Sequence, residues 1–306
     1  MERLTLPHAA HALWMRVEQP LSLALRHLRT AGVQWTLGGG TVMAARWLHR
    51  RSNDIDLTVP QGSGIHTLSH EASGFTAQMM AAGARRAALG TRHHVIEFSG
   101  TTGSLEITEM DLRPAGGATL MRCGTSEIFV CTNTQIIRGK LERSLRHEAP
   151  PRDLYDTAVA ARLDPQSLAQ AVNMLPPEAV REIANEWRQN EHRLRHEAVN
   201  ALEDVDPEHQ RLLGDIVGVA SQAILDARYT VIEISRRQQA IAIRAATSGG
   251  GRHTVRATSE TLRHTLEASG LDEYLRSGHL GVGGGREQID DLAAGRIPGP
   301  IVVSSI

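Results

Sequence analysis

The sequence predicts an α/β domain with a mixed β-sheet, followed by an all-helical region. Two observations predict this order. In the first part of the chain, segments with alternating apolar residues are separated by glycine-rich turns and short helical stretches, as is typical of α/β domains. From Asn133 onward, apolar residues recur every three or four positions, and proline or an N-cap residue opens several segments.

The length of 306 residues corresponds to roughly two domains at about 150 residues each. We assign 1–150 to the α/β domain, 151–246 to a helical domain that closes the cleft, and 247–306 to a loosely packed extension rich in Gly and Arg. The alternative for the extension is contact with RNA, because arginines outnumber glutamates there and just before it. These arginines are Arg236, Arg237, Arg244, Arg252, Arg256 and Arg263.

Composition excludes several classes of protein. With 41% hydrophobic and 22% charged residues, the chain is neither disordered, collagen-like nor a coiled-coil rod. Its two cysteines do not form a zinc cluster or a disulfide scaffold, and its 15 histidines lack metal-ligand spacing. No export signal and no apolar run of membrane-spanning length is present, so we expect a cytoplasmic protein that does not bind membranes.

The N-terminal elements follow from periodicity and turn residues. We expect a helix over 8–30 bent at Pro20, a strand through Trp35 and Leu37, a helix over 41–51, and a strand from Ile55. A loop over 60–74, a helix over 75–82, a hairpin of 94–98 with 104–110 and a strand over 127–132 are expected next. After them we expect helices over 135–146 and 153–162, helices that begin at 165, 177 and 207, and a helix over 259–275.

The strongest candidate site is Asp54-Ile55-Asp56 at the start of the second strand. Side chains two positions apart in a strand project from one face, so both carboxylates share a face while Ile55 points to the core. Two crowded carboxylates are unfavourable unless a cation lies between them, and such oxygens suit Mg²⁺ held jointly with phosphates. The pair therefore predicts a divalent metal site.

A glycine-rich turn precedes this pair by one helix length. Gly39 and Gly40 join the first strand to the next helix. Without Cβ atoms, backbone N–H groups there can approach a ligand closely, and the helix N-terminus adds its positive dipole end. The turn predicts a phosphate cradle beside the metal site.

Two motifs resemble those of a known family. Residues 38–41 (GGGT) followed by 49–57 (HRRSNDIDL) resemble the first motif of the AbiEii/MenT nucleotidyltransferase toxins, within the polymerase-β-like superfamily. Residues 140–145 (KLERSL) followed by 152–156 (RDLYD) are similar to the second signature of that family. The order and spacing match over 35–160, and the family fold agrees with an α/β domain followed by helices.

The resemblance implies an NTP-dependent nucleotidyltransferase that releases pyrophosphate. In that scheme Asp54 and Asp56 hold Mg²⁺, with Mn²⁺ as an alternative, and the backbone around Gly39 and Gly40 takes the terminal phosphates. Thr41 is placed beside them by the same motif. Chemistry of this kind depends mainly on positioning and charge neutralisation.

By the same resemblance, Lys140 neutralises the triphosphate and Asp153 places or deprotonates the acceptor hydroxyl. Lys140 is the single lysine among 33 basic residues. An ammonium is a compact point charge with three rotatable donors, whereas a guanidinium is a wide planar fork. A lysine kept where arginine is otherwise used agrees with a specific role at this position.

Several assignments stay open. Glu106 is the candidate for a third metal carboxylate, with Glu97 as the second choice, and a solvated glutamate is the alternative for either. Ser52 and Arg50 either contact phosphate or are capping or surface groups at the end of the preceding helix. Asp156 either joins the site or pairs with a neighbouring arginine.

We expect the chain to act as the Mg²⁺-dependent toxin of a toxin–antitoxin pair. It would transfer NMP to RNA, with the tRNA 3′ end as the preferred acceptor, and thereby block translation. A cognate antitoxin is then the expected protein partner. RNA contacts are expected from Arg138, Arg143, Arg146 and Arg152. The alternatives are a small-molecule or protein hydroxyl as acceptor, and a non-catalytic nucleotide-binding module.

Overall fold

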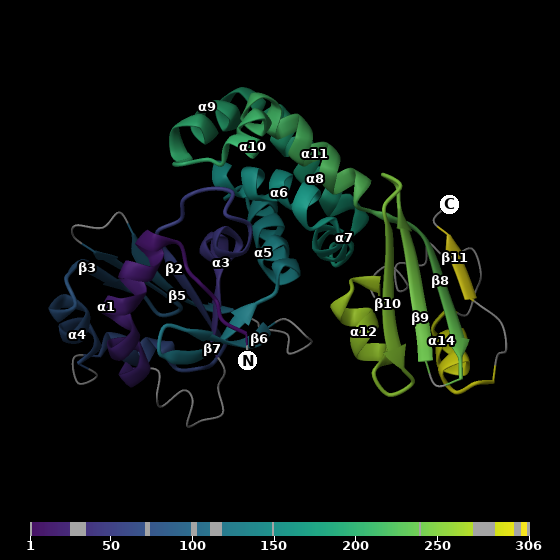
Figure 1. Cartoon of the computed structure of the whole chain (residues 1–306), viewed down its shortest axis with the longest axis horizontal. Helices are drawn as coiled ribbons and strands as arrows, with labels where there is room; N and C mark the ends of the chain where they lie inside the picture. The colour runs from purple at the N-terminus through teal and green to yellow at the C-terminus, as the bar shows by residue number, and fades with distance from the viewer. Residues whose placement is uncertain are drawn as a thin grey trace. The chain divides into compact units, whose positions relative to one another are not determined.

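The computed structural model describes residues 2–24, 35–70, 74–98, 103–110, 118–148, 150–238, 240–271, 285–296 and 301–304. The chain divides into two compact units (Figure 1). Unit 1 comprises Met1–Thr132 with Leu202–Asp206, and unit 2 comprises Asn133–Ala201 with Pro207–Ile306. In the described part of the chain, no helix combines the length and apolar character needed to cross a membrane.

Unit 1 is built on a seven-stranded mixed sheet in the order β3-β4-β5-β2-β1-β7-β6. The strands are β1 (Thr36–Gly38), β2 (Ile55–Pro60), β3 (Ala84–Leu89), β4 (His93–Phe98), β5 (Ser104–Met110), β6 (Ala118–Cys123) and β7 (Ser126–Cys131). The central β2 runs antiparallel to β1 and parallel to β5, while β1 runs parallel to β7. Apolar side chains of alternate residues, such as Leu37, Leu57 and Ile107, are fully buried on one face.

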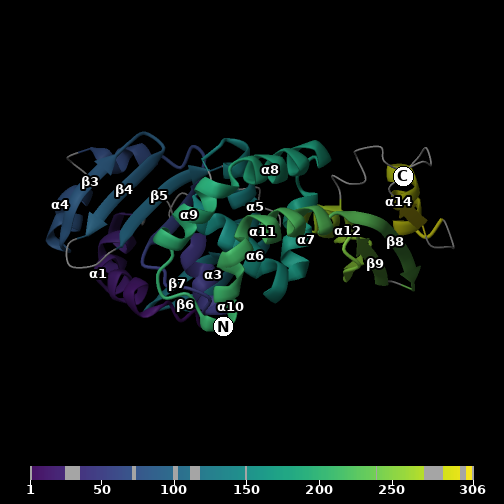
Figure 2. The ribbon, with the colours of Figure 1, turned by 90° about the horizontal axis from the view of Figure 1, so that it is seen from above.

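Short helices complete unit 1, as Figure 2 shows from above. They are α1 (His8–Ala24), α3 (Gly39–Trp47), η1 (Ile65–Ser69) and α4 (Phe75–Ala81). Leu13 and Val17 of α1 are buried with Phe75 and Met79 of α4. This core fixes one face of the sheet, so the other face, with Asp56 half-buried on it, is left for a site.

Unit 2 begins with a helical bundle. Its helices are α5 (Asn133–Leu145), α6 (Pro151–Leu163), α7 (Pro165–Asn173), α8 (Pro177–Gln189), α9 (Glu191–Ala201), α10 (Pro207–Gln210), η3 (Arg211–Asp215) and α11 (Ile216–Asp226). Prolines open α6, α7, α8 and α10, as expected at a first turn where the N–H needs no partner. The aromatic side chains of Tyr155 and Trp187 are buried in the bundle.

A second sheet follows the bundle. It is antiparallel, with the order β10-β9-β8-β11, and its strands are β8 (Tyr229–Arg237), β9 (Ala240–Thr247), β10 (Arg252–Thr258) and β11 (Ile301–Ser304). Two helices, α12 (Leu262–Ala268) and α14 (Gly285–Ala293), belong to this part of the chain. Tyr229 and Arg228 connect it to α7 by hydrogen bonds to Asn173, Val172 and Leu175.

Most N-terminal predictions are confirmed, including the β4–β5 hairpin, the helix after the glycines, and the helices from Asn133 to Asp226. The helix expected over 41–51 ends earlier, at Trp47, because Leu48 adopts a left-handed conformation. The predicted helix over 8–30 is described to Ala24, and its remainder lies outside the described residues. Strands β3 and β6 were not predicted.

The predicted organisation of the second half needs correction. Unit 2 begins at Asn133, so the boundary at residue 150 is wrong. The helical domain over 151–246 contains β8 and most of β9, and the loosely packed extension over 247–306 contains β10 and β11 of an ordered sheet. Alanine and arginine favour helices intrinsically, but pairing with neighbouring strands overrides that preference.

Candidate active site

The glycine turn and the second aspartate lie in contact in unit 1. Gly38 pairs with Asp56 across the β1–β2 ladder, and α3 begins at Gly39. Gly39 has a φ of 69°, a conformation that side-chain-bearing residues rarely adopt. A Cβ on Gly39 would overlap the Asp56 carboxylate. Glycine is therefore required here both by the backbone conformation and by the close approach of a carboxylate.

The turn also presents a helix N-terminus beside Asp56. Gly38 is the N-cap of α3 and makes no side-chain capping bond, and the first turn of α3 contains no acidic residue. The leading N–H groups of a helix lack intrahelical partners and carry the positive end of its dipole. Gly40, in this first turn, has the position that the sequence predicted for a phosphate-binding backbone.

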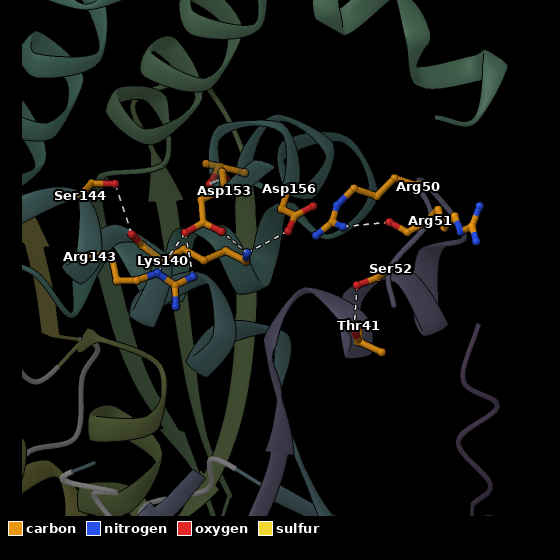
Figure 3. Close-up of polar contacts among 10 residues, drawn as sticks. Thr41, Arg50, Arg51, Ser52, Lys140, Arg143, Ser144, Asp153 and Asp156 are labelled. Carbon is orange, nitrogen blue, oxygen red and sulfur yellow. Dashed lines mark hydrogen bonds and ion pairs between the residues drawn. The ribbon is translucent and has the colours of Figure 1, made fainter. Parts of the chain in front are cut away.

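Asp54 is held just before β2 by hydrogen bonds. Its Oδ1 accepts from both the backbone N and the Oγ of Ser104, each at 3.0 Å. The buried Thr41 hydroxyl donates to the Asp54 carbonyl and lies 2.7 Å from the Ser52 hydroxyl (Figure 3). Thr41 and Ser52 thus fix the path of the chain into the aspartate pair.

A loop segment of unit 1 packs beside the aspartates. The N–H of Arg51 donates to the Glu203 carbonyl, and the N–H of Asp206 donates to the His49 carbonyl, each at 3.0 Å. Arg50 is buried and donates to the carbonyl of Arg51. These contacts fix 49–51 outside α3, which ends at Trp47 and does not continue to Arg51 as predicted.

The strand pairing places one of the two candidates for a third metal carboxylate closer to Asp56 than the other. Glu106 on β5 pairs directly with Asp56, whereas Glu97 pairs with Ser104 from β4, one strand farther away. The Glu106 carboxylate lies 3.4 Å from Nε2 of His93. No three His, Cys, Asp or Glu side chains in the described ranges gather closely enough to hold a metal by themselves.

The second motif forms a buried ion-pair cluster in unit 2 (Figure 3). Lys140 of α5 pairs with Asp153 and Asp156 of α6, and its Nζ lies 2.8 Å from Oδ2 of Asp156. All three side chains are at most 3% exposed. Arg143 completes the cluster, since its Nη2 lies 2.7 Å from Oδ2 of Asp153.

The charges of this cluster stabilise its carboxylates. Burial by itself raises the pKa of the Asp153 carboxyl, but the neighbouring Lys140 and Arg143 charges outweigh it and hold that pKa below its usual range. Two cations and two carboxylates make the cluster electrically balanced, as a buried charge requires. Asp153 is therefore ionised at neutral pH.

The predicted residues fall into two groups. Gly39, Gly40, Thr41, Ser52, Asp54, Asp56 and Glu106 belong to unit 1, whereas Lys140 and Asp153 belong to unit 2. The sequence did not identify Ser104 as a residue that supports Asp54, because a serine in such a role has no motif of its own. The only local feature that marks it is the preceding Gly103. Asp156 pairs with Lys140, whereas the sequence suggested a neighbouring arginine as its partner.

Comparisons with solved structures give two low-similarity matches. The crystal structure of JHP933 from Helicobacter pylori is 14% identical with a TM-score of 0.39, covering 72% of this chain and 95% of that one. The solution structure of the antibiotic-resistance factor ANT(2'')-Ia is 17% identical with a TM-score of 0.26, covering 58% and 94%. No curated protein matches the chain.

The family comparison is decisive. The model described as nucleotidyl transferase AbiEii toxin, type IV toxin–antitoxin system, matches residues 23–230. This range contains the glycine turn, the aspartate pair and the Lys140 cluster, and it ends at the start of β8. The chain belongs to the AbiEii nucleotidyltransferase toxin family of type IV toxin–antitoxin systems.

Proposed function

We propose that this chain is a Mg²⁺-dependent toxin that transfers a nucleoside monophosphate from an NTP to an RNA hydroxyl, at the tRNA 3′ end. The acceptor oxygen forms a bond to the α-phosphorus while the bond from that phosphorus to the bridging oxygen breaks. Pyrophosphate leaves, and the hydroxyl proton passes to a carboxylate. Blocking the tRNA terminus prevents its aminoacylation and stops translation.

The observation that carries the proposal is the contact between Gly39 and Asp56. A carboxylate seated against a Cβ-free turn brings an anionic metal ligand and a helix N-terminus to the same place. Polyphosphate recognition needs both, because phosphate oxygens are shared between backbone donors and a cation. A turn shaped only for folding has no need of an aspartate in this position.

The donors on this face fit Mg²⁺. Asp54 and Asp56 supply hard carboxylate oxygens, and register places Glu106 beside Asp56. Mg²⁺ is commonly held by one or two carboxylates together with substrate phosphates rather than by an all-protein cage. When bound, it would neutralise charge on the phosphates and orient them. Ser104 and Thr41 keep the Asp54 segment in position for this role.

For unit 2 we propose that Lys140 offsets triphosphate charge and that Asp153 places the acceptor hydroxyl or accepts its proton. The support is the similarity of 140–156 to the second signature of the family. The lowered pKa of Asp153 keeps its carboxylate ionised, which favours the positioning role over proton uptake, because a lowered pKa weakens a base. The pairing with Asp156 would hold Lys140 in one orientation.

The family also supports a protein partner, since a type IV toxin has a cognate antitoxin. We propose that this antitoxin and a cytoplasmic RNA pool are the partners of the chain.

The test is incubation of purified protein with total tRNA and each of four α-³²P NTPs, with and without Mg²⁺. We expect label on tRNA from at least one NTP only when Mg²⁺ is present. The D56N variant keeps the shape of the side chain but removes its charge, and we expect labelling to fall at least 100-fold.

The matched control is E97Q, which makes the same acid-to-amide change on the same face, two strands away from Asp56. We expect it to label tRNA like the wild type, and E106Q to lie between the two. Labelling that survives D56N would refute the assignment of the site. Label that appears on a small molecule or on protein, but not on tRNA, would refute the RNA acceptor.

A further inference from the structure

One face of the C-terminal sheet is buried in a hydrophobic core. Ile232, Ile234, Ile241 and Ile243 alternate along β8 and β9 and are at most 1% exposed. Buried side chains of the accompanying helices are Leu262 and Leu266 of α12 and Ile289 and Leu292 of α14. Arg236, two residues from Ile234 on the same face, donates to carbonyls at the end of α14, so this helix lies on the isoleucine side of the sheet.

The opposite face carries four arginines, which we call the arginine face: Arg237, Arg244, Arg252 and Arg256. The ladder registers place them on three adjacent strands, because Arg252 pairs with Ala246, Arg256 with Ala242, and Arg244 with Thr254. All four side chains are exposed. Small residues separate them, so the guanidinium groups rise above a low surface.

This face has a strong local charge. Its one acidic residue among the described strands is Glu233, which lies 2.8 Å from Arg244. Four arginines against one glutamate leave three positive charges, whereas the whole chain has a net charge of −1. The neighbouring Arg236 is used differently, since its Nη1 donates to the carbonyls of Leu292 and Ala293 at the end of α14.

Three of the four arginines that the sequence suggested for RNA contacts lie in α5 or directly after it, and each has a local carboxylate partner. Arg138 pairs with Glu142, Arg143 with Asp153, and Arg146 with Glu148. Of the four arginines on the arginine face, only Arg244 pairs with a carboxylate within the described part of the chain. Positive charge on this face therefore exceeds what the fold uses.

We propose that the arginine face binds the phosphate backbone of the RNA acceptor. Guanidinium groups bind phosphate in a bidentate manner, and such contacts position a nucleic acid without reading its sequence. The face suits RNA better than a protein partner, because its outward residues on the described strands are arginine, alanine, serine, threonine, valine and one glutamate, with no aromatic anchor. The proposal rests on the proposed RNA acceptor and gives the C-terminal sheet a role outside the matched family segment.

The test compares the full chain with its R252A/R256A variant. Binding of 5′-labelled tRNA is followed by fluorescence anisotropy without NTP, at several salt concentrations between 50 and 200 mM. We expect the affinity to fall about tenfold and the slope of log K against log salt to decrease by roughly 1.5, as for two lost phosphate contacts. Exposed surface arginines contribute little to folding, so the unfolding midpoint should stay unchanged.

The matched control is R85A/R92A, which removes two exposed arginines from β3 and the turn that follows it in unit 1. We expect it to bind tRNA like the wild type. In the labelling assay, R252A/R256A should raise the KM for tRNA and leave kcat near the wild-type value, because the face binds rather than reacts.

The outcomes separate the two proposals. If tRNA is labelled but both double variants bind it like the wild type, the RNA role of the arginine face is overturned and the transferase proposal stands. If R252A/R256A keeps tRNA affinity but loses the cognate antitoxin, the face is a protein interface and the inference is likewise wrong. If tRNA is neither bound nor labelled by the wild type, both proposals fail.

Discussion

The two units hold the aspartates of the two motifs in opposite ways. In unit 1, Asp54 and Asp56 are half-buried, and Asp54 accepts hydrogen bonds from Ser104 at the edge of a glycine turn. In unit 2, Asp153 and Asp156 are almost completely buried and share the ammonium group of Lys140. The first arrangement leaves the carboxylates partly exposed to solvent, and the second removes them from water.

The difference in burial predicts that the unit 1 carboxylates matter mainly for activity and the unit 2 carboxylates also for stability. A half-buried carboxylate held by hydrogen bonds can take up a cation from solution with little reorganisation. A buried carboxylate needs its cationic partner for the protein to stay folded, because desolvated charge without a partner is strongly unfavourable. Substitutions in unit 1 should therefore affect catalysis first, and those in the unit 2 cluster should affect folding as well.

The largest effect on stability is expected for K140M. Methionine is similar in volume but uncharged, so two buried carboxylates lose the cation they share. We expect the free energy of unfolding to fall by about 3–5 kcal/mol, measured by urea denaturation, and tRNA labelling to be lost. The comparison between the units fails if K140M is as stable as the wild type.

The control for K140M is R146M. Arg146 is 58% exposed and pairs with Glu148 at the surface. Exposed pairs contribute about 0–1 kcal/mol, so R146M should unfold close to the wild-type urea concentration. K140R adds a second contrast, since it keeps the charge but changes its shape, and we expect it to lose more activity than stability.

Acidification should reveal the same cluster with a smaller effect. The pKa of Asp153 is lowered in the folded chain, so its ionised form contributes stability that is full above the ordinary carboxyl pKa of about 3.9. That contribution is lost as the pH falls below this value toward the folded-state pKa. We expect the difference in unfolding free energy between the wild type and D153N to shrink from pH 5 to pH 3, and a constant difference would contradict the lowered pKa.

Much of unit 1 and its site could be predicted from local sequence. Three features are short-range signals, and the structure contains each of them: the alternation of apolar residues up to Gly38, the Asp54–Asp56 spacing, and the β4–β5 hairpin that includes Ser104. A same-face relation of two strand residues needs only the two-residue period of a strand. The pairing of Glu106 with Asp56 depends on strand order, which local sequence does not specify.

The C-terminal sheet shows where local reading fails. The β9 sequence AIAIRAAT alternates, but alanine and arginine are intrinsically good helix formers, and helices make up most of the chain from Asn133 to Asp226. Its strands are stabilised by pairing with β8 and β10 and by isoleucines on one face. The early end of α3 has a similar cause, since its continuation is replaced by tertiary hydrogen bonds to 203–206.

A more moderate effect is expected for G39A, which sharpens the description of unit 1. Alanine at a φ of 69° is strained, and its Cβ would push the Asp56 carboxylate away. We expect a loss of about 1–3 kcal/mol in unfolding free energy and tRNA labelling reduced by more than 100-fold. The control is G62A, where φ is 78° and no atom lies within 4 Å of the added Cβ. G62A should lose only the unfolding free energy that the strained backbone conformation costs, and it should keep its labelling. Equal loss of labelling in both variants would contradict the role of the Gly39–Asp56 contact.

The smallest effect is expected for S104A, which removes one of the two hydrogen bonds that Asp54 Oδ1 accepts from this residue. The backbone N–H of residue 104 remains, so the carboxylate keeps part of its support. We expect labelling to fall about three- to tenfold, with a change in unfolding free energy of about 1 kcal/mol or less. The control is S63A, which removes a 3.0 Å bond from a serine hydroxyl to Glu109 elsewhere in unit 1 and should leave labelling unchanged. Because both variants delete a hydroxyl bonded to a carboxylate, only a role for Asp54 in the reaction explains a difference in labelling between them.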